Sequence, residues 1–184
     1  MMKVFFPEFA LGIKTIFFTI IGPLINPAGA PNHLMGVYQP HLVDLVGEAV
    51  TQLDMNHVIV AHGMDGLDEI SILGPTKIAE VRGGTVERYE ITPEDFGFSR
   101  ARYEDVQGGD PAFNAGVIRG IFEGRDVGPR RDFLLLNNAY ALYVAGAAAS
   151  PQEGLEKARE NLDSGRALAK LEEFAAASQQ FASA

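Results

Sequence analysis

Residues 58–71 read Val-Ile-Val-Ala-His-Gly-Met-Asp-Gly-Leu-Asp-Glu-Ile-Ser. The apolar run at the start has the composition of a buried β-strand, and the glycines that follow indicate that this strand ends in a turn. Three carboxylates then lie within five residues, at Asp65, Asp68 and Glu69. Ligand sites in open α/β sheets commonly lie where a strand ends in a loop. We therefore take this acidic loop as the candidate functional site.

Two neighbouring segments place this strand in a β-α-β unit. Residues 34–38 are expected to form a strand, and residues 41–53 a helix whose apolar side chains recur at three- and four-residue spacing. Residues 57–61 form the second strand. Units of this kind make parallel, right-handed connections. The pattern predicts an α/β fold with a mainly parallel sheet.

The rest of the chain predicts a β-hairpin followed by helices. Polarity alternates on both sides of Arg82-Gly83-Gly84, which is typical of two strands joined by a glycine turn. Pro, Gly and Asp are frequent in residues 92–111, which should form a connecting loop. Capping residues and apolar spacing predict a C-terminal cluster of helices over 111–124, 131–145, 150–165 and 166–181.

The composition limits the class of protein. A chain of 184 residues with 47% hydrophobic residues is expected to form a single domain over 1–184. Its net charge of −9 would repel the phosphates of nucleic acid, so nucleic acid is not an expected partner. The chain has no cysteine, which excludes disulfides and thiolate chemistry and fits a cytoplasmic protein.

The first thirty residues allow two interpretations. Residues 4–25 read as a buried helix or strand that leads into a rigid loop over 22–31, where three prolines and two glycines leave no room for regular structure. Alternatively, Lys3, Lys14, the apolar stretch 15–25 and Ala28-Gly29-Ala30 resemble an export signal. Glu8 and Pro23 argue against the signal. The apolar run is too short for a membrane span, so no membrane is expected.

The acidic loop also has two interpretations. Magnesium prefers oxygen ligands and is often held by one or two carboxylates, with water and substrate phosphates completing its shell, so Asp68 and Glu69 could bind Mg²⁺. A solvated acidic turn is the alternative. His62 could line a pocket or simply pack at the strand end. The sequence has neither a GxxxxGK[ST] phosphate loop nor a G-x-S-x-G nucleophile motif.

Five segments together resemble anthranilate phosphoribosyltransferase. The resemblance extends over nearly the whole chain, and the combination of these segments is more specific than any one of them. The matching segments are Leu11–Phe17, Ile21–Ala28, His62–Ser71, Asn137–Gly146 and Asp163–Gly165.

The resemblance implies an enzyme of tryptophan biosynthesis that joins anthranilate to phosphoribosyl pyrophosphate and releases pyrophosphate. It implies a nucleoside phosphorylase/phosphoribosyltransferase-like fold, Mg²⁺ as cofactor, and often a homodimer. By the same resemblance, Asp68 and Glu69 are metal ligands. Gly22 and Pro23 lie near the path of anthranilate, and His62 joins them as a candidate substrate-binding residue. The resemblance assigns no catalytic residue here.

The matched segments correspond to the C-terminal part of the family's large α/β domain, so the chain is expected to be a truncated domain. The family's N-terminal helical domain and glycine-rich phosphate loop are not represented, and Glu8 stands where the family has an arginine. Turnover by this chain alone is therefore not expected. The alternatives are a non-catalytic remnant, half of a split enzyme that binds a complementary N-terminal chain, or a nucleoside phosphorylase-like protein.

Overall fold

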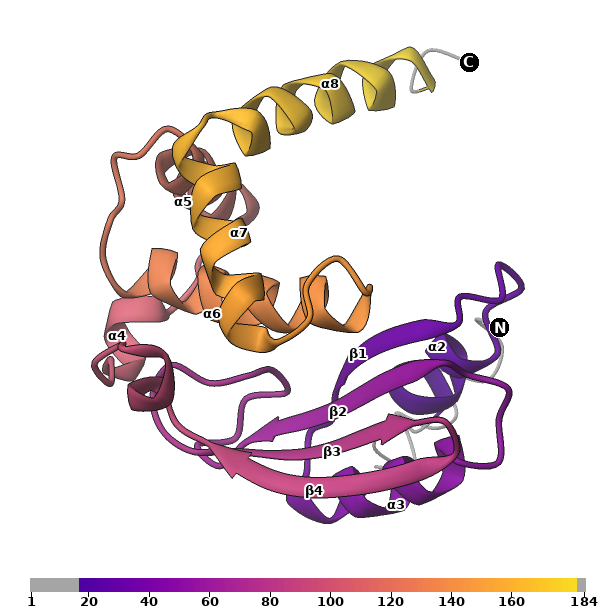
Figure 1. Cartoon of the computed structure of the whole chain (residues 1–184). Coiled ribbons are helices and arrows are strands. Elements are labelled where there is room, and N and C mark those ends of the chain that lie inside the picture. Colours follow the sequence, from indigo (N-terminus) through magenta and orange to yellow (C-terminus); the bar gives the residue numbers. More distant parts are fainter. Residues whose placement is uncertain (1–16, 182–184) are drawn as a thin grey trace.

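A computed structural model of the chain describes residues 17–181 (Figure 1). The expectations for residues 4–16, which include the start of a buried N-terminal segment, the charged front of a signal and the position of Glu8, lie outside the described residues. The strands are β1 (Asn32–Gly36), β2 (His57–Gly63), β3 (Thr76–Arg82) and β4 (Thr85–Ile91). The longer helices are α3 (Pro40–Val50), α5 (Pro111–Phe122), α6 (Pro129–Val144), α7 (Pro151–Asp163) and α8 (Arg166–Phe181). The short helical turns are η1 (Phe17–Ile21), α2 (Gly22–Leu24), η2 (Pro93–Phe96) and α4 (Tyr103–Val106).

The structure confirms the predicted β-α-β unit. Helix α3 joins β1 to β2, and the two strands pair in parallel, with Met35 opposite Val60. Pro40 lies in the first turn of α3, where a missing backbone N–H leaves no hydrogen bond unmade. Strand β2 continues two residues beyond its predicted end because His62 and Gly63 still pair with β3.

Strands β3 and β4 form the predicted hairpin. Gly83 and Gly84, at its turn, have φ values of 57° and 76°, which side chains with a Cβ rarely adopt. Strands β2 and β3 also pair in antiparallel fashion, so the sheet of the described residues is mixed, in the order β1-β2-β3-β4. This confirms the α/β class but corrects the expectation of a mainly parallel sheet. Residues 64–75 contain no crossover helix, and they return the chain directly into an antiparallel partner.

Helices cover both faces of the sheet, with α3 on one face and α6 and α7 on the other (Figure 1). Strand β2 is buried along its whole length, and alternate residues of a strand face opposite sides. Val58 and Val60 pack in a core with α3, whereas Ile59 and Ala61 pack in a core with α6. Burial on both faces explains why the sequence of this strand is apolar without interruption.

The predicted C-terminal helices are present, and α6 lies between the sheet and α7 (Figure 1). A Cβ on Gly154 of α7 would lie 2.3 Å from the carbonyl oxygen of Ala139, so glycine is what allows the two helices to approach so closely. Helix α8 begins after Gly165 and projects away from the sheet (Figure 1). Residues 92–111, predicted as a loop, also contain η2 and α4. Among the described residues, no helix has the length and apolar content needed to cross a membrane.

A buried polar network connects α6 to the sheet near the start of β2. The Glu80 carboxylate accepts hydrogen bonds of 2.8 Å from Tyr89, Tyr143 and Nε2 of His57. Arg82 donates to Nδ1 of His57 at 2.9 Å, which leaves the histidine neutral with its proton on Nε2. The network satisfies a carboxylate that is only 12% exposed.

Burial and hydrogen bonding shift the pKa values of His57 and Glu80, the two groups at the centre of this network. Burial raises the pKa of Glu80, but the three donated hydrogen bonds outweigh burial, so the pKa lies below its ordinary value of 4.5. Burial, together with the positive charge of Arg82, holds the pKa of His57 below 6.5. The folded state therefore favours an ionised Glu80 and a neutral His57.

Acid is expected to destabilise the fold through these two groups. Because both folded-state pKa values are lowered, the unfolded chain binds more protons, and the free energy of unfolding should fall below about pH 6.5 and again below about pH 4.5. Glu80→Gln should cost about 1–3 kcal/mol at neutral pH and make the lower step smaller. Urea unfolding of the wild type and Glu80→Gln across this pH range tests the two expected steps. The control is Asp54→Asn, which removes an exposed carboxylate before β2. An unchanged lower step in Glu80→Gln would contradict this assignment.

Candidate functional site

The acidic loop is closed by its own backbone. The N–H of Gly63, at the end of β2, donates to the carbonyl of Leu67 at 2.8 Å, and the N–H of Gly66 donates to the carbonyl of Gly63 at 2.8 Å. Gly66 has a φ of 104°, a conformation that favours glycine. Met64 donates to the carbonyl of Pro75 at 2.9 Å, which ties the two ends of the loop together. The turn predicted from these glycines is therefore present and compact.

Asp65 belongs to the frame of this loop. One of its carboxylate oxygens accepts the N–H of Leu67 at 3.1 Å, and the other accepts a short hydrogen bond from the Ser71 hydroxyl. The N–H of Ser71 in turn donates to the Thr76 hydroxyl at 2.8 Å. Of the three carboxylates in the loop, only Asp68 and Glu69 remain for a ligand.

Gly36 holds the loop against the end of β1. A Cβ at this position would lie 1.5 Å from the carbonyl oxygen of Asp68 and 2.5 Å from its carbonyl carbon, which no side chain can tolerate. The backbone of Asp68 therefore rests directly on the backbone of the strand. This contact fixes the peptide unit between Asp68 and Glu69.

Asn137 of α6 holds the other side of the loop. Its Oδ1 accepts the N–H of Ile70 at 3.1 Å, and its Nδ2 donates to the carbonyl of Ile70 at 2.8 Å. Ile70 is 1% exposed and packs in the core on the α6 side of the sheet. The residue that follows Glu69 is thus fixed through both of its main-chain polar groups.

Asp68 and Glu69 are exposed and adjacent. Among residues 17–181, the ion pairs leave both carboxylates without a basic partner. Partial burial, and then the charge of Asp68, raise the pKa of Glu69 above its ordinary value. Two uncompensated carboxylates side by side form a donor set that suits a divalent cation with hard oxygen preference.

The size of this donor set also fits magnesium. The part of the chain that the structure describes holds no group of three or more His, Cys, Asp or Glu residues arranged to bind a metal. Magnesium differs from structural zinc or calcium in this respect, because it commonly takes one or two carboxylates and completes its shell with water and phosphate oxygens. Asp68 and Glu69 are the residues that would hold it.

A cleft of about 420 Å³ lies beside Glu69, between residues 106–108, α5 and α6. Its volume is within the range of small-molecule sites. Polar groups at its wall include Asn137 and Arg130, and among the described residues Nε of Arg130 is buried without a hydrogen-bond partner. The apolar lining consists of Val106, Val117, Ile118, Ile121, Phe133 and Leu134. The acidic pair therefore borders a mainly apolar cleft of ligand size.

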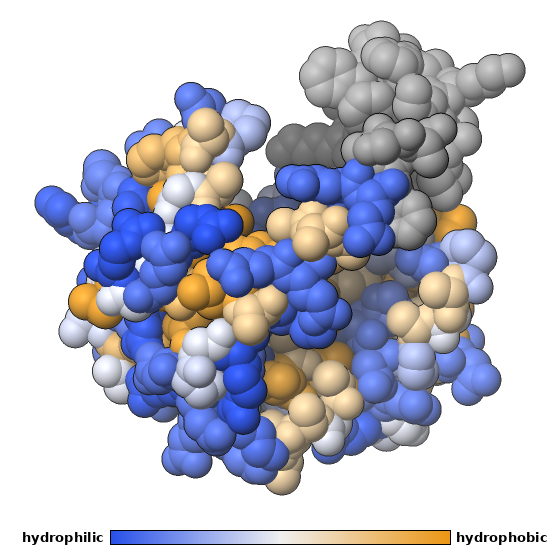
Figure 2. Space-filling model, turned by 90° about the horizontal axis from the view of Figure 1, so that it is seen from above, coloured by the Kyte–Doolittle hydropathy of each residue, from blue (hydrophilic) through white to orange (hydrophobic). Residues whose placement is uncertain are grey.

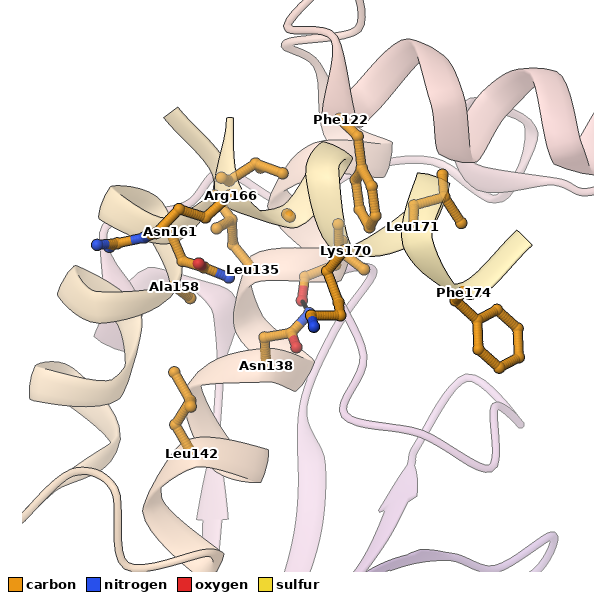
Figure 3. Close-up of a pocket in the computed structure, with 13 residues that line it drawn as sticks. Phe122, Leu135, Asn138, Leu142, Ala158, Asn161, Arg166, Lys170, Leu171 and Phe174 are labelled. Atoms are coloured by element: carbon orange, nitrogen blue, oxygen red, sulfur yellow. Dashed lines mark hydrogen bonds between the residues drawn. The ribbon is translucent and has the colours of Figure 1, made fainter. Parts of the chain in front are cut away.

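A second, larger cavity of about 730 Å³ lies under α8 and is separate from the acidic loop. Helices α6, α7 and α8 line it together with Phe122 of α5, and Phe174 of α8, which also lines it, is 70% exposed (Figure 3). Seen from above, on the helical side, apolar side chains gather in the middle of the face between polar ones (Figure 2). Neither Asp68 nor Glu69 lines this cavity.

The other predicted site residues are placed differently: His62 lies next to the acidic loop, and Gly22 and Pro23 lie away from it. His62 is 4% exposed, and its Nδ1 donates to the carbonyl of Val37 at 2.7 Å, so it packs at the end of β2 just before the loop. Gly22 and Pro23 are half-buried in α2, which lies toward the end of the sheet where β2 begins, away from the acidic loop (Figure 1). Substrate binding by these three residues stays a prediction.

Sequence reasoning missed two residues that shape the site. From the sequence, Gly36 has no role beyond its place near the predicted strand 34–38, and Asn137 is only part of a segment that matches the family. Each had a local signal: Gly36 interrupts an apolar strand, and Asn137 is an amide within a mostly apolar helix. The partner of each was not visible, because both contacts join segments that are distant in the sequence.

The fold and the acidic loop define an α/β protein with a two-carboxylate site beside a ligand-sized cleft. The sequence matches the model of the family described as "Glycosyl transferase family, a/b domain" over residues 1–168, and the chain belongs to this family.

Two similar proteins are anthranilate phosphoribosyltransferases. Anthranilate phosphoribosyltransferase of Geobacter sulfurreducens is 49% identical over 168 residues, which cover 91% of this chain and 47% of that protein. The protein of the same name from Rubrobacter xylanophilus is 46% identical over 172 residues, covering 94% of this chain and 50% of its own length. The chain thus spans about half the length of the curated relatives it matches. The predicted resemblance is confirmed.

Solved structures agree with the sequence matches. The crystal structure of anthranilate phosphoribosyltransferase from Thermus thermophilus has a TM-score of 0.82 and 38% identity, and covers 92% of this chain and 49% of that one. The Saccharomyces cerevisiae enzyme in complex with PRPP and Mg has a TM-score of 0.79 and 27% identity, with 91% and 48% coverage. The predicted phosphoribosyltransferase-like fold is confirmed by both.

Gly36→Ala is expected to displace the acidic loop. The new Cβ would overlap the Asp68 carbonyl, so the free energy of unfolding should fall by about 1–3 kcal/mol, as for other overpacked sites. Gly74→Ala in the same loop is the matched control, because a Cβ there meets no atom within 4 Å. Urea unfolding of both variants measures the difference. Equal stability of the two would show that the close approach to Asp68 is not a constraint.

Proposed function

We propose that this chain supplies the metal-binding side of a site that transfers phosphoribosyl from phosphoribosyl pyrophosphate to anthranilate in tryptophan biosynthesis. The observation that carries the proposal is the pair Asp68 and Glu69, which lie side by side without a basic partner among the described residues, on a loop whose backbone is fixed. The names of the relatives and the yeast complex with PRPP and Mg support the same activity. The reaction class is pentosyl transfer.

In this proposal, Asp68 and Glu69 are the two protein ligands of Mg²⁺. The ion would neutralise charge on the pyrophosphate, which is the leaving group of the transfer. The two carboxylates would hold the metal pyrophosphate at the end of β2, beside the 420 Å³ cleft. His62 would form part of the wall behind them, with its Nδ1 already engaged by Val37. For Gly22 and Pro23, substrate binding rests on the resemblance alone.

The same proposal requires residues beyond those matched here. The chain spans about half the length of its relatives, and its sequence contains no glycine-rich phosphate loop. We therefore propose that the chain corresponds to part of the family's α/β domain, and that residues outside the matched half, on the same or a complementary polypeptide, provide the remaining phosphate contacts. A homodimer of such assemblies, in the cytoplasm, completes the proposal. The absence of cysteine fits this compartment.

Neutralising the acidic pair is expected to weaken binding of magnesium pyrophosphate. Asp68→Asn/Glu69→Gln removes both charged ligands, so the affinity should fall by at least about tenfold. The matched control is Glu172→Gln/Glu173→Gln, another adjacent exposed pair, whose charges are compensated by Arg119 and Lys170. Titration calorimetry with Mg²⁺ and pyrophosphate measures both variants. Wild-type affinity in the first variant would refute the metal role of the loop.

Turnover is expected only when the missing contacts are restored. The purified chain alone should not convert anthranilate and phosphoribosyl pyrophosphate, because most phosphate contacts would have no donor. Adding a polypeptide with the upstream half of the Geobacter sulfurreducens relative should restore conversion, measured as loss of anthranilate fluorescence. Phosphate-dependent release of a base from a nucleoside would instead favour a nucleoside phosphorylase-like activity.

A further inference from the structure

Asn137 is the main anchor between the acidic loop and the helical side of the fold. Its side-chain amide pairs with both main-chain groups of Ile70, at 3.1 Å and 2.8 Å, across 67 residues of sequence. We propose that Asn137 is a positioning residue that sets the direction of the Glu69 carboxylate. The inference rests on the proposed function, because it assumes that Asp68 and Glu69 are the metal ligands.

The peptide units on the two sides of Glu69 explain how this positioning works. The carbonyl of Asp68 belongs to the peptide unit before Glu69, and Gly36 confines that unit by direct backbone contact. The N–H of Ile70 belongs to the peptide unit after Glu69, and Asn137 binds that N–H. Peptide units are planar, so fixing both of them fixes the two backbone dihedral angles of Glu69. The direction in which its side chain leaves the backbone is then fixed as well.

Asn137 is itself held in one orientation. Its Nδ2 also donates to the carbonyl of Phe133, one turn earlier in α6, at 3.1 Å. Only one assignment of the amide satisfies all three bonds, because the Ile70 N–H needs an oxygen and the two carbonyls need the NH₂ group. Helix α6 also contacts the sheet directly, because the Tyr143 hydroxyl donates to Glu80 of β3 at 2.8 Å. A rigid helix therefore carries the amide.

An apolar residue at position 137 could not replace this pairing. Ile70 is almost completely buried, and among the described residues its N–H and carbonyl pair with Asn137 rather than with another backbone segment. Without the amide, both groups would be buried and unpaired, which favours movement of the loop toward water. The neighbouring Asn138 differs in this respect. It is exposed, and its amide bonds only within its own helix, to Leu134 at 2.9 Å.

Three variants of the full chain test this role. Asn137→Ala removes the pairing with Ile70, Asn137→Gln keeps an amide but displaces it by one methylene, and Asn138→Ala is the matched control. Hydrogen exchange of residues 64–73 reports how firmly the loop is held. The affinity for Mn²⁺ with inorganic pyrophosphate, followed by electron paramagnetic resonance, reports ligand geometry. Asp68→Asn/Glu69→Gln defines the signal without a metal site.

Asn137→Ala is expected to speed exchange in residues 64–73 and to weaken binding of the manganese probe by about tenfold or more, as other residues that orient metal ligands do. Asn137→Gln should show both effects to a smaller degree, and Asn138→Ala neither. Thermal unfolding of each variant separates these effects from a general loss of stability, which alone would not change the affinity of the folded fraction.

Wild-type probe affinity in Asn137→Ala, together with lost binding in Asp68→Asn/Glu69→Gln, would overturn the positioning role and leave the proposed function intact. Equal binding by the wild type and Asp68→Asn/Glu69→Gln would overturn the metal role, and with it any role of Asn137 toward the metal. If Asn137→Ala does not fold, Asn137→Gln decides, because wild-type affinity with a displaced amide would also overturn the inference.

Discussion

Burial of β2 on both of its faces is the constraint on which the other features depend. Val58 and Val60 face α3, and Ile59 and Ala61 face α6. Each fully buried valine or isoleucine side chain contributes about 1.5–3 kcal/mol, so burial of this strand favours a helix on each side of the sheet. The loop that follows β2 consequently emerges between β1 and α6. That position allows Gly36 from one side and Asn137 from the other to contact its backbone.

The three carboxylates of the loop have different surroundings. Asp65 is engaged by Leu67 and Ser71, so its charge is stabilised by hydrogen bonds within the loop. Asp68 and Glu69 repel each other, and the raised pKa of Glu69 reflects this repulsion after the effect of burial. Such an arrangement does not favour folding. It persists because the backbone on both sides is determined by the rest of the structure, as is typical of functional sites.

Much of this architecture could be predicted from the sequence. The apolar run of β2, the glycine turn at Gly83 and the helix caps are local signals, and the structure reproduces each of them. The strand order could not be predicted, because the connection over 64–75 carries no signal that distinguishes a return from a crossover. The acidic loop itself was found from its charge.

The contacts that shape the loop were beyond sequence reasoning. A glycine in a strand and an asparagine in a helix have many possible roles, and only the folded chain shows that Gly36 meets Asp68 and that Asn137 meets Ile70. The structural role of Asp65 could not be predicted either, because the sequence does not show whether Ser71 contacts Asp65 or faces solvent. Charge and turn chemistry located the site, but its internal geometry depends on long-range packing.

The span of the contact between Ile70 and Asn137 has a consequence for the order of folding. The bonds within the loop join residues a few positions apart and can form early, whereas the bond to α6 closes a loop of 67 residues. We therefore expect the two exposed carboxylates to reach their final geometry only once α6 has packed beside the loop. A ligand that binds this geometry would stabilise the folded chain against unfolding, because the unfolded chain does not present the same site.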